Sequence, residues 1–124
     1  MSNKNKILLF LLICASLISC RSKHHTQIST SDSGNELRFT AFFPTSKTEK
    51  VERFIHKSLQ PANLFANGHE EVDATMVLSD DTRLHIKSAA GRLKIEFDKN
   101  RNSEASYERV RKLCEGIKEI IVAQ

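Results

Sequence analysis

Four residues with metal-binding side chains lie close together in the sequence: His69, Glu70, Glu71 and Asp73. Imidazole and carboxylate ligands suit zinc or manganese. The four residues straddle a loop and the expected start of a strand, so nothing in their spacing defines a coordination geometry. We therefore expect these residues to form a solvated acidic loop, which could contact a partner protein. A metal-binding module is the alternative. No cofactor is implied.

Motifs with an established catalytic spacing are absent from the sequence. It has no Gly-rich phosphate loop, no nucleophile elbow and no helix with paired His ligands for zinc. The acidic turn at Asp80 and Asp81 lacks the twelve-residue, Gly-containing loop of an EF-hand. The sequence therefore favours a protein that is not an enzyme.

The N-terminus is divided into three successive regions. Lys4 and Lys6 give a short basic region, residues 7–18 are almost all apolar, and polar sequence begins at Arg21. A basic region, an apolar region and a small residue before the break are the parts of a secretory signal peptide. The apolar run is shorter than the ~20 residues that span a bilayer. We therefore predict a cleaved signal peptide over residues 1–19.

The tetrad Leu17-Ile18-Ser19-Cys20 resembles the lipobox of bacterial lipoproteins. The resemblance implies transfer of diacylglycerol to the Cys20 thiol, cleavage between Ser19 and Cys20, and N-acylation of the new terminus. Two or three acyl chains on one residue hold a protein on a membrane effectively irreversibly. In the enterobacterial sorting rule, a residue other than Asp after the lipidated Cys implies the outer membrane, and here that residue is Arg21. The resemblance therefore implies an envelope lipoprotein that faces the periplasm, and it implies nothing about the fold.

Only one thiol remains free in the mature chain that this processing implies. Cys14 leaves with the signal peptide and Cys20 is acylated, so Cys114 has no partner for an intramolecular disulfide. Cys114 falls on the apolar side of an expected helix. A reactive thiol needs an exposed, electropositive setting, so we expect Cys114 to be a small buried core residue.

The positive charge of the chain is concentrated at its N-terminus. The whole sequence has 19 Lys and Arg against 15 Asp and Glu, with a net charge of +4 and a pI near 9.1. Without Lys4 and Lys6 the balance is 17 against 15, and over residues 36–124 it is 15 against 14. This near-neutral domain and its envelope destination exclude nucleic acid as the partner.

The segment that follows Cys20 is polar. Residues 21–35 contain a single aliphatic side chain, Ile28, and such a segment buries too little surface to offset the entropy of ordering it. We therefore predict that residues 20–35 are the lipidated Cys and a flexible tether, and that residues 36–124 form one small domain.

Hydrophobic periodicity predicts the elements of this domain. A strand over residues 37–43 ends at Pro44, and a capping box from Ser46 to Glu49 begins a helix that closes before Pro61. Strands follow at 72–79, 82–88 and 92–98, and a long helix begins near residue 104. The predicted fold class is α+β: a two-layer sandwich with an antiparallel four-stranded sheet and two helices on one face, in the order β-α-β-β-β-α. Gly116 is expected to allow close approach of the last helix to the sheet.

The strand alternation leaves one face of the sheet polar. The candidate binding face on this side comprises Arg38, Thr40, Phe42, His85, Lys87, Arg92 and Lys94. Its cationic side chains and one exposed aromatic ring suit an acidic protein, lipid headgroups or glycan phosphates.

These features together predict a lipid-anchored, non-enzymatic envelope protein whose small domain binds another macromolecule, with a protein as the expected partner. One form of this function is an immunity lipoprotein that neutralises a secreted antibacterial effector. The alternative is an accessory or assembly lipoprotein of an envelope complex, and a module for a metal or an anionic ligand is a third possibility. The sequence is equally compatible with an immunity lipoprotein and with an assembly lipoprotein.

Overall fold

The computed structural model describes residues 26–60, 64–65 and 71–124. The expected signal peptide, the lipobox and Cys20 lie outside these residues, as do His69 and Glu70. Within the described part of the chain, no helix is both long enough and apolar enough to cross a membrane.

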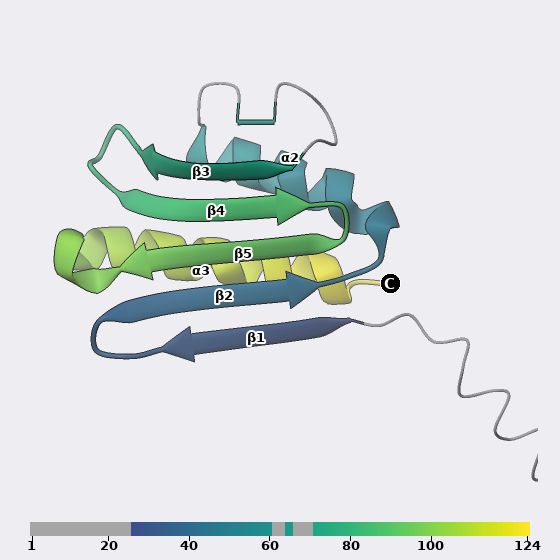
Figure 1. The fold of residues 1–124 in the computed structure, drawn as a ribbon, viewed down its shortest axis with the longest axis horizontal. Helices are drawn as coiled ribbons and strands as arrows, with labels where there is room; N and C mark the ends of the chain where they lie inside the picture. The colour runs from purple at the N-terminus through teal and green to yellow at the C-terminus, as the bar shows by residue number, and fades with distance from the viewer. Residues whose placement is uncertain (1–25, 61–63, 66–70) are drawn as a thin grey trace, which may run out of the picture.

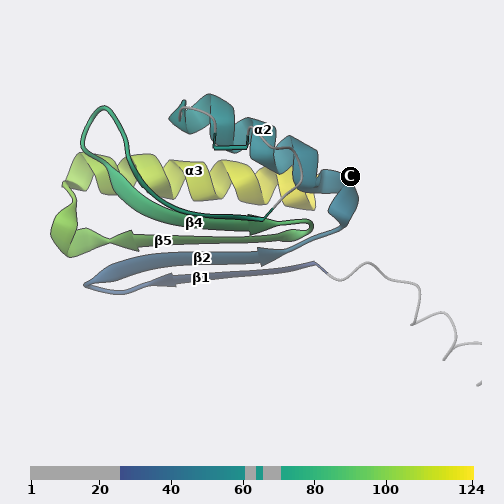
Figure 2. The same ribbon diagram turned by 45° about the horizontal axis from the view of Figure 1, so that its top comes forward.

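Five strands form one antiparallel sheet, and two helices cover one of its faces (Figures 1 and 2). In spatial order the strands are β1 (Gln27–Asp32), β2 (Glu36–Phe42), β5 (Arg92–Asp98), β4 (Arg83–Ala89) and β3 (Val72–Val77). The helices α2 (Thr48–Leu59) and α3 (Glu104–Val122) contact each other above the sheet, and the 3-10 turns η1 (Thr45–Lys47) and η2 (Lys99–Arg101) precede them. The expected two-layer α+β sandwich is confirmed.

The sheet has five strands rather than the expected four, because β1 forms within the segment predicted to be a tether. At the turn after β1, the Ser33 N–H donates to the Glu36 carbonyl at 2.9 Å, and β1 then pairs with β2 along its whole length. Hydrogen bonding to an existing strand orders this polar segment although its side chains bury little surface. The element order is therefore β-β-α-β-β-β-α, and the tether prediction was wrong for residues 27–35.

A polar contact at the end of β1 holds this edge strand against α3. Asp32 accepts a hydrogen bond from the Tyr107 hydroxyl and forms an ion pair with Lys99, and the Lys99 ammonium lies 4.8 Å from the centre of the Tyr107 ring. We call these three residues the β1 clasp. The hydrogen bonds from Lys99 and Tyr107 hold the pKa of Asp32 below its ordinary value of 3.8, and the bond to Asp32 raises the pKa of Tyr107 above 10.0.

The alternation of the three central strands builds the core beneath the helices. Each strand sends every second side chain inward, and these side chains meet one apolar stripe from each helix. The buried set comprises Leu37, Phe39 and Ala41 of β2, Leu93, Ile95 and Phe97 of β5, Leu84 and Ile86 of β4, Val51, Ile55 and Leu59 of α2, and Val110, Leu113, Cys114, Ile117 and Ile121 of α3. Burial of one large aliphatic or aromatic side chain stabilises the fold by about 1.5–3 kcal/mol, so this set decides which face of the sheet the helices cover.

Helix α2 begins differently from the prediction. The expected capping box does not form, because η1 occupies Thr45–Lys47 and Lys47, the residue before α2, makes no side-chain cap. The Lys47 ammonium instead donates to the Ile121 carbonyl at the C-terminus of α3, at 2.6 Å. A cation at this position complements the negative end of the helix dipole. The Thr48 hydroxyl accepts from the Gly91 N–H at 2.9 Å and so ties α2 to the β4–β5 turn.

The absence of a side chain at Gly116 makes room for the neighbouring helix. A Cβ added there would lie 2.3 Å from Cζ of the Phe54 ring on α2. The close approach expected at Gly116 is therefore between α3 and α2, not between α3 and the sheet.

The substitution Gly116→Ala tests this helix contact. Alanine adds roughly 1 kcal/mol of helix propensity, but the clash with Phe54 costs about 1–3 kcal/mol of overpacking, so we expect net destabilisation in urea denaturation. Leucine lacks the ring atoms that clash, and in a Phe54→Leu background the same substitution should therefore stabilise the protein. Gly34→Ala, with nothing within 4 Å of the added carbon, is the neutral control. Equal effects of Gly116→Ala in both backgrounds would contradict the assignment.

The β1 clasp predicts two pH limits for the docking of β1. Asp32 has a lowered pKa, so its contribution is present above about pH 4 and is lost as the pH falls through the lowered value. Tyr107 has a raised pKa, so its contribution is present below about pH 10 and is lost as the pH rises through the raised value. The methyl resonance of Ile28 on β1, followed by NMR, should shift at both limits. Asp32→Asn should remove the acid transition, and its persistence in that variant would count against the clasp.

Candidate functional site

The face of the sheet opposite the helices is uncovered in the described part of the chain. We call it the open face. Its outward positions are Gln27, Ser29, Ser31, Glu36, Arg38, Thr40, Phe42, Asp73, Thr75, Val77, Arg83, His85, Lys87, Ala89, Arg92, Lys94, Glu96 and Asp98. All seven residues of the candidate binding face lie on it. The sequence analysis missed the three β1 residues, because their ordering depends on pairing with β2.

Strand register arranges the open face in rows that run across the strands. One row consists of Ser29, Thr40, Lys94, Lys87 and Asp73, each directly opposite its neighbour. This row places two like charges, Lys87 and Lys94, opposite each other, an arrangement that destabilises a sheet. Lys94 is compensated along its own strand by Glu96 at 3.0 Å, whereas Lys87 lies 3.7 Å from Asp73.

The next row is self-complementary in charge. Glu96 lies opposite Arg38 on one side and His85 on the other. The hydrogen bond from Lys94, followed by the charges of Lys94, Arg38 and His85, holds the pKa of Glu96 below its ordinary value of 4.5. Glu96 is therefore a carboxylate at neutral pH, with Lys94 and Arg38 beside it.

Both ring nitrogens of His85 have partners. The Nε2 atom lies 2.5 Å from a carboxylate oxygen of Asp73, and the Nδ1 atom lies 2.8 Å from the Thr75 hydroxyl. Nε2 donates to the carboxylate, and Nδ1 accepts from the Thr75 hydroxyl when the ring is neutral or donates to it when the ring is protonated. His85 is thus held in place by two side chains of β3, Asp73 and Thr75.

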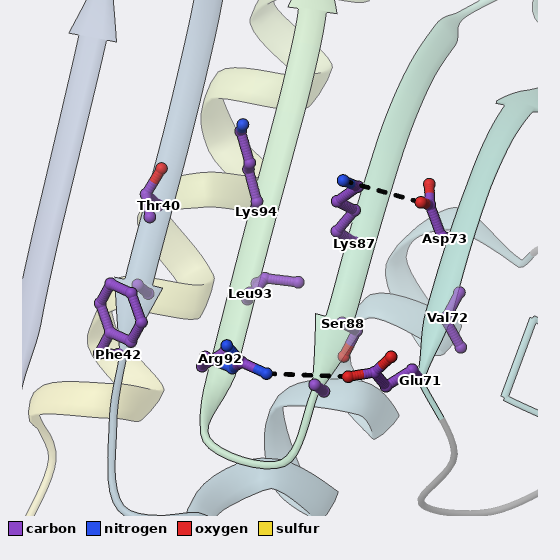
Figure 3. Close-up of a pocket in the computed structure, with 12 residues that line it drawn as sticks. Thr40, Phe42, Glu71, Val72, Asp73, Lys87, Ser88, Arg92, Leu93 and Lys94 are labelled. Carbon is purple, nitrogen blue, oxygen red and sulfur yellow. Dashed lines mark ion pairs between the residues drawn. The ribbon is translucent and has the colours of Figure 1, made fainter.

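Two depressions hollow the open face, one toward each end of the strands. The first has a volume of about 330 Å³ and is lined by Phe42, Glu71, Lys87, Arg92 and Lys94, among others (Figure 3). Figure 3 shows the Arg92 side chain reaching across the depression toward Glu71, and their charged atoms are 3.7 Å apart. Glu71 was expected in a solvated acidic loop. Its ion pair with Arg92 depends on the register of β3, β4 and β5, so no local sequence pattern predicts it.

The second depression has a volume of about 490 Å³ and lies toward the other end of the same face. Thr75, Val77, Arg83, His85 and Glu96 are among its lining residues. Each depression thus contains one exposed apolar side chain: Phe42 is 43% exposed in the first and Val77 is 59% exposed in the second.

The structure bears on only half of the candidate metal ligands. His69 and Glu70 lie outside the described residues, while Glu71 pairs with Arg92, and Asp73 pairs with His85 and Lys87. Among the described residues, no group of three or more His, Cys, Asp or Glu is placed to hold a metal ion. The metal module therefore stays a prediction.

Cys114 lies in the core, as expected. Its side chain is 5% exposed and is a free thiol. Burial, followed by the charge of Glu115, raises the pKa of this thiol to about 12. The thiolate is the reactive form, so Cys114 is unreactive at neutral pH and belongs to the packing of α3.

No family model matches the chain, and no curated protein and no solved structure matches it. The open face is therefore interpreted from its own geometry and charge.

Proposed function

We propose that this chain is a lipid-anchored protein of the bacterial envelope whose open face binds another protein without catalysing a reaction. The observation that carries the proposal is the pair of depressions on the open face, each with an exposed apolar side chain inside a rim of charged groups. Protein interfaces have this arrangement: an apolar anchor enters a pocket, and a polar rim surrounds it.

The charge of the open face indicates the kind of protein surface that fits. From Gln27 to the end, the chain has 15 basic and 15 acidic residues. The eighteen outward positions of the open face include five basic residues, Arg38, Arg83, Lys87, Arg92 and Lys94, and four acidic ones, Glu36, Asp73, Glu96 and Asp98. The charge of the open face is therefore mixed, with Lys87, Arg92 and Lys94 toward the Phe42 end and Glu36, Glu96 and Asp98 toward the Val77 end. A protein surface with the complementary pattern of both charges fits it.

The anchor rests on the lipobox resemblance and is part of the same proposal. Acylated Cys20 holds the chain on the outer membrane, and the domain faces the periplasm. Two forms of the partner fit this position: a secreted antibacterial effector that the domain neutralises as an immunity protein, or a subunit of an envelope complex that it helps to assemble. A toxin-like reading frame adjacent to this one supports the first form, and co-purification with resident envelope subunits supports the second.

Site-specific photo-crosslinking in cells tests the open face directly. A photo-reactive amino acid placed at Arg38 or Thr75, both on the open face, should give one discrete adduct of higher mass after irradiation. The same amino acid at Lys112 or Lys118, exposed on α3, should give none. After the adduct is identified, Arg38→Glu should weaken binding of the purified partner roughly tenfold, or about 1.4 kcal/mol. Adducts from α3 without adducts from the open face would place the interface elsewhere.

Substitution of Cys20 tests the anchor separately. Cys20→Ala removes the only thiol in the tetrad, so the variant should accumulate as a precursor that retains residues 1–19 and lacks acyl mass. Cys14→Ala is the matched control, because that thiol leaves with the signal peptide, and it should be processed normally. Intact mass spectrometry and membrane fractionation measure both outcomes. Normal outer-membrane fractionation of the Cys20→Ala variant would contradict the lipid anchor.

A further inference from the structure

The structure shortens the connection between the anchor and the domain. The predicted tether extended to residue 35, but β1 begins at Gln27, so six residues separate Cys20 from the sheet. Seven Cα-to-Cα steps of at most ~3.6 Å span no more than about 25 Å. If Cys20 is acylated, the start of β1 is therefore held within about 25 Å of the membrane-bound residue.

The strand register places the first depression at this same end of the sheet. Gln27 lies opposite Phe42, and Phe42 lies opposite Arg92. Neighbouring strands are ~4.8 Å apart, so Phe42 and Arg92 lie within about 10 Å of the residue at which the chain enters the fold. Figure 1 shows the start of β1, the end of β2 and the β4–β5 turn at one end of the molecule.

The chemistry of this end suits an anionic surface. Lys87 and Lys94 lie directly opposite each other one row further in, beside Arg92. The carboxylates that face Lys87 and Arg92 are 3.7 Å away, and all four of these side chains are more than half exposed. Contacts of this length and exposure contribute little and exchange readily. Phe42 adds an exposed aromatic ring among the cations, which is the combination found where proteins rest on lipid headgroups.

We propose that the Phe42 end of the open face, with Lys87, Arg92 and Lys94, rests on the anionic phospholipid headgroups of the membrane that holds Cys20. The inference rests on the lipid anchor of the proposed function. It assigns the two depressions to different partners: the first lies against lipid, and the second, around Val77 and Arg83, remains open to the protein partner. The membrane contact thereby orients the protein-binding part of the face away from the bilayer.

The absence of Trp from the sequence allows a single introduced Trp to report on each depression. The acylated, full-length mature protein is reconstituted into phosphatidylglycerol and phosphatidylethanolamine vesicles with bromine on the upper acyl chain. With Phe42→Trp, the emission should shift to shorter wavelength and lose most of its intensity relative to vesicles without bromine. Val77→Trp is the control, because Val77 lies opposite Arg83, six residues along β4 from Ala89, which is about 20 Å. Its emission should not change.

A charge variant separates headgroup binding from mere proximity. Adding Lys87→Gln and Arg92→Gln to the Phe42→Trp protein should abolish most of the quenching, as should replacing phosphatidylglycerol by phosphatidylcholine. Absent quenching at position 42, or equal quenching at positions 42 and 77, overturns this inference while the crosslinking result for the open face stands. Mass spectra that lack the acyl groups on Cys20 overturn the anchor, and this inference with it.

Discussion

The structure depends on one constraint: a sheet has two faces, and the helices α2 and α3 cover only one of them. Along each strand, the position of a residue within the alternation therefore decides whether it supports the core or meets the surroundings. Phe42 and Phe43 are adjacent and chemically identical, yet Phe43 is 6% exposed and Phe42 is 43% exposed. A shift of register by one residue would exchange the two sets of side chains. The open face is thus the necessary counterpart of the core.

The strand β1 determines where the chain enters the fold. An edge strand made of polar residues gains order from its backbone pairing with β2 and from the clasp of Asp32 with Lys99 and Tyr107 on the helical side. This pairing widens the open face by one strand. It also places the start of the sheet, at Gln27, beside Phe42. A small set of contacts therefore fixes where the chain enters the open face, and with it the distance from this face to the proposed anchor at Cys20.

Periodicity in the sequence was enough to predict the two layers, the pairing of the helices on one face and the seven residues of the candidate binding face. Each of these features follows from local alternation, which the hydrophobic pattern of a strand records directly. The predictions that were wrong concern features that depend on contacts between residues distant in the sequence. β1 needs β2 as a partner. The 3-10 turn η1 takes Ser46, the predicted cap, away from the start of α2. Gly116 faces α2 because of how the two helices are rotated about their axes. Neighbours within a row, such as Lys87 and Lys94, depend on the register of β4 with β5, which no local pattern specifies.

The two rows at the centre of the open face differ in how their charges are arranged. Around Glu96 the fold places a carboxylate between Arg38 and His85, so this row is complementary without any external group. In the adjacent row it places Lys94 opposite Lys87. A like-charged pair of this kind costs on the order of 0.2–1 kcal/mol, which is small beside a folding free energy of about 5–15 kcal/mol, so the fold tolerates it. An anion between the two ammonium groups removes that repulsion and gains two attractive contacts. Of these two rows, the one that contains Lys87 and Lys94 is therefore the one at which an external anionic group gains more.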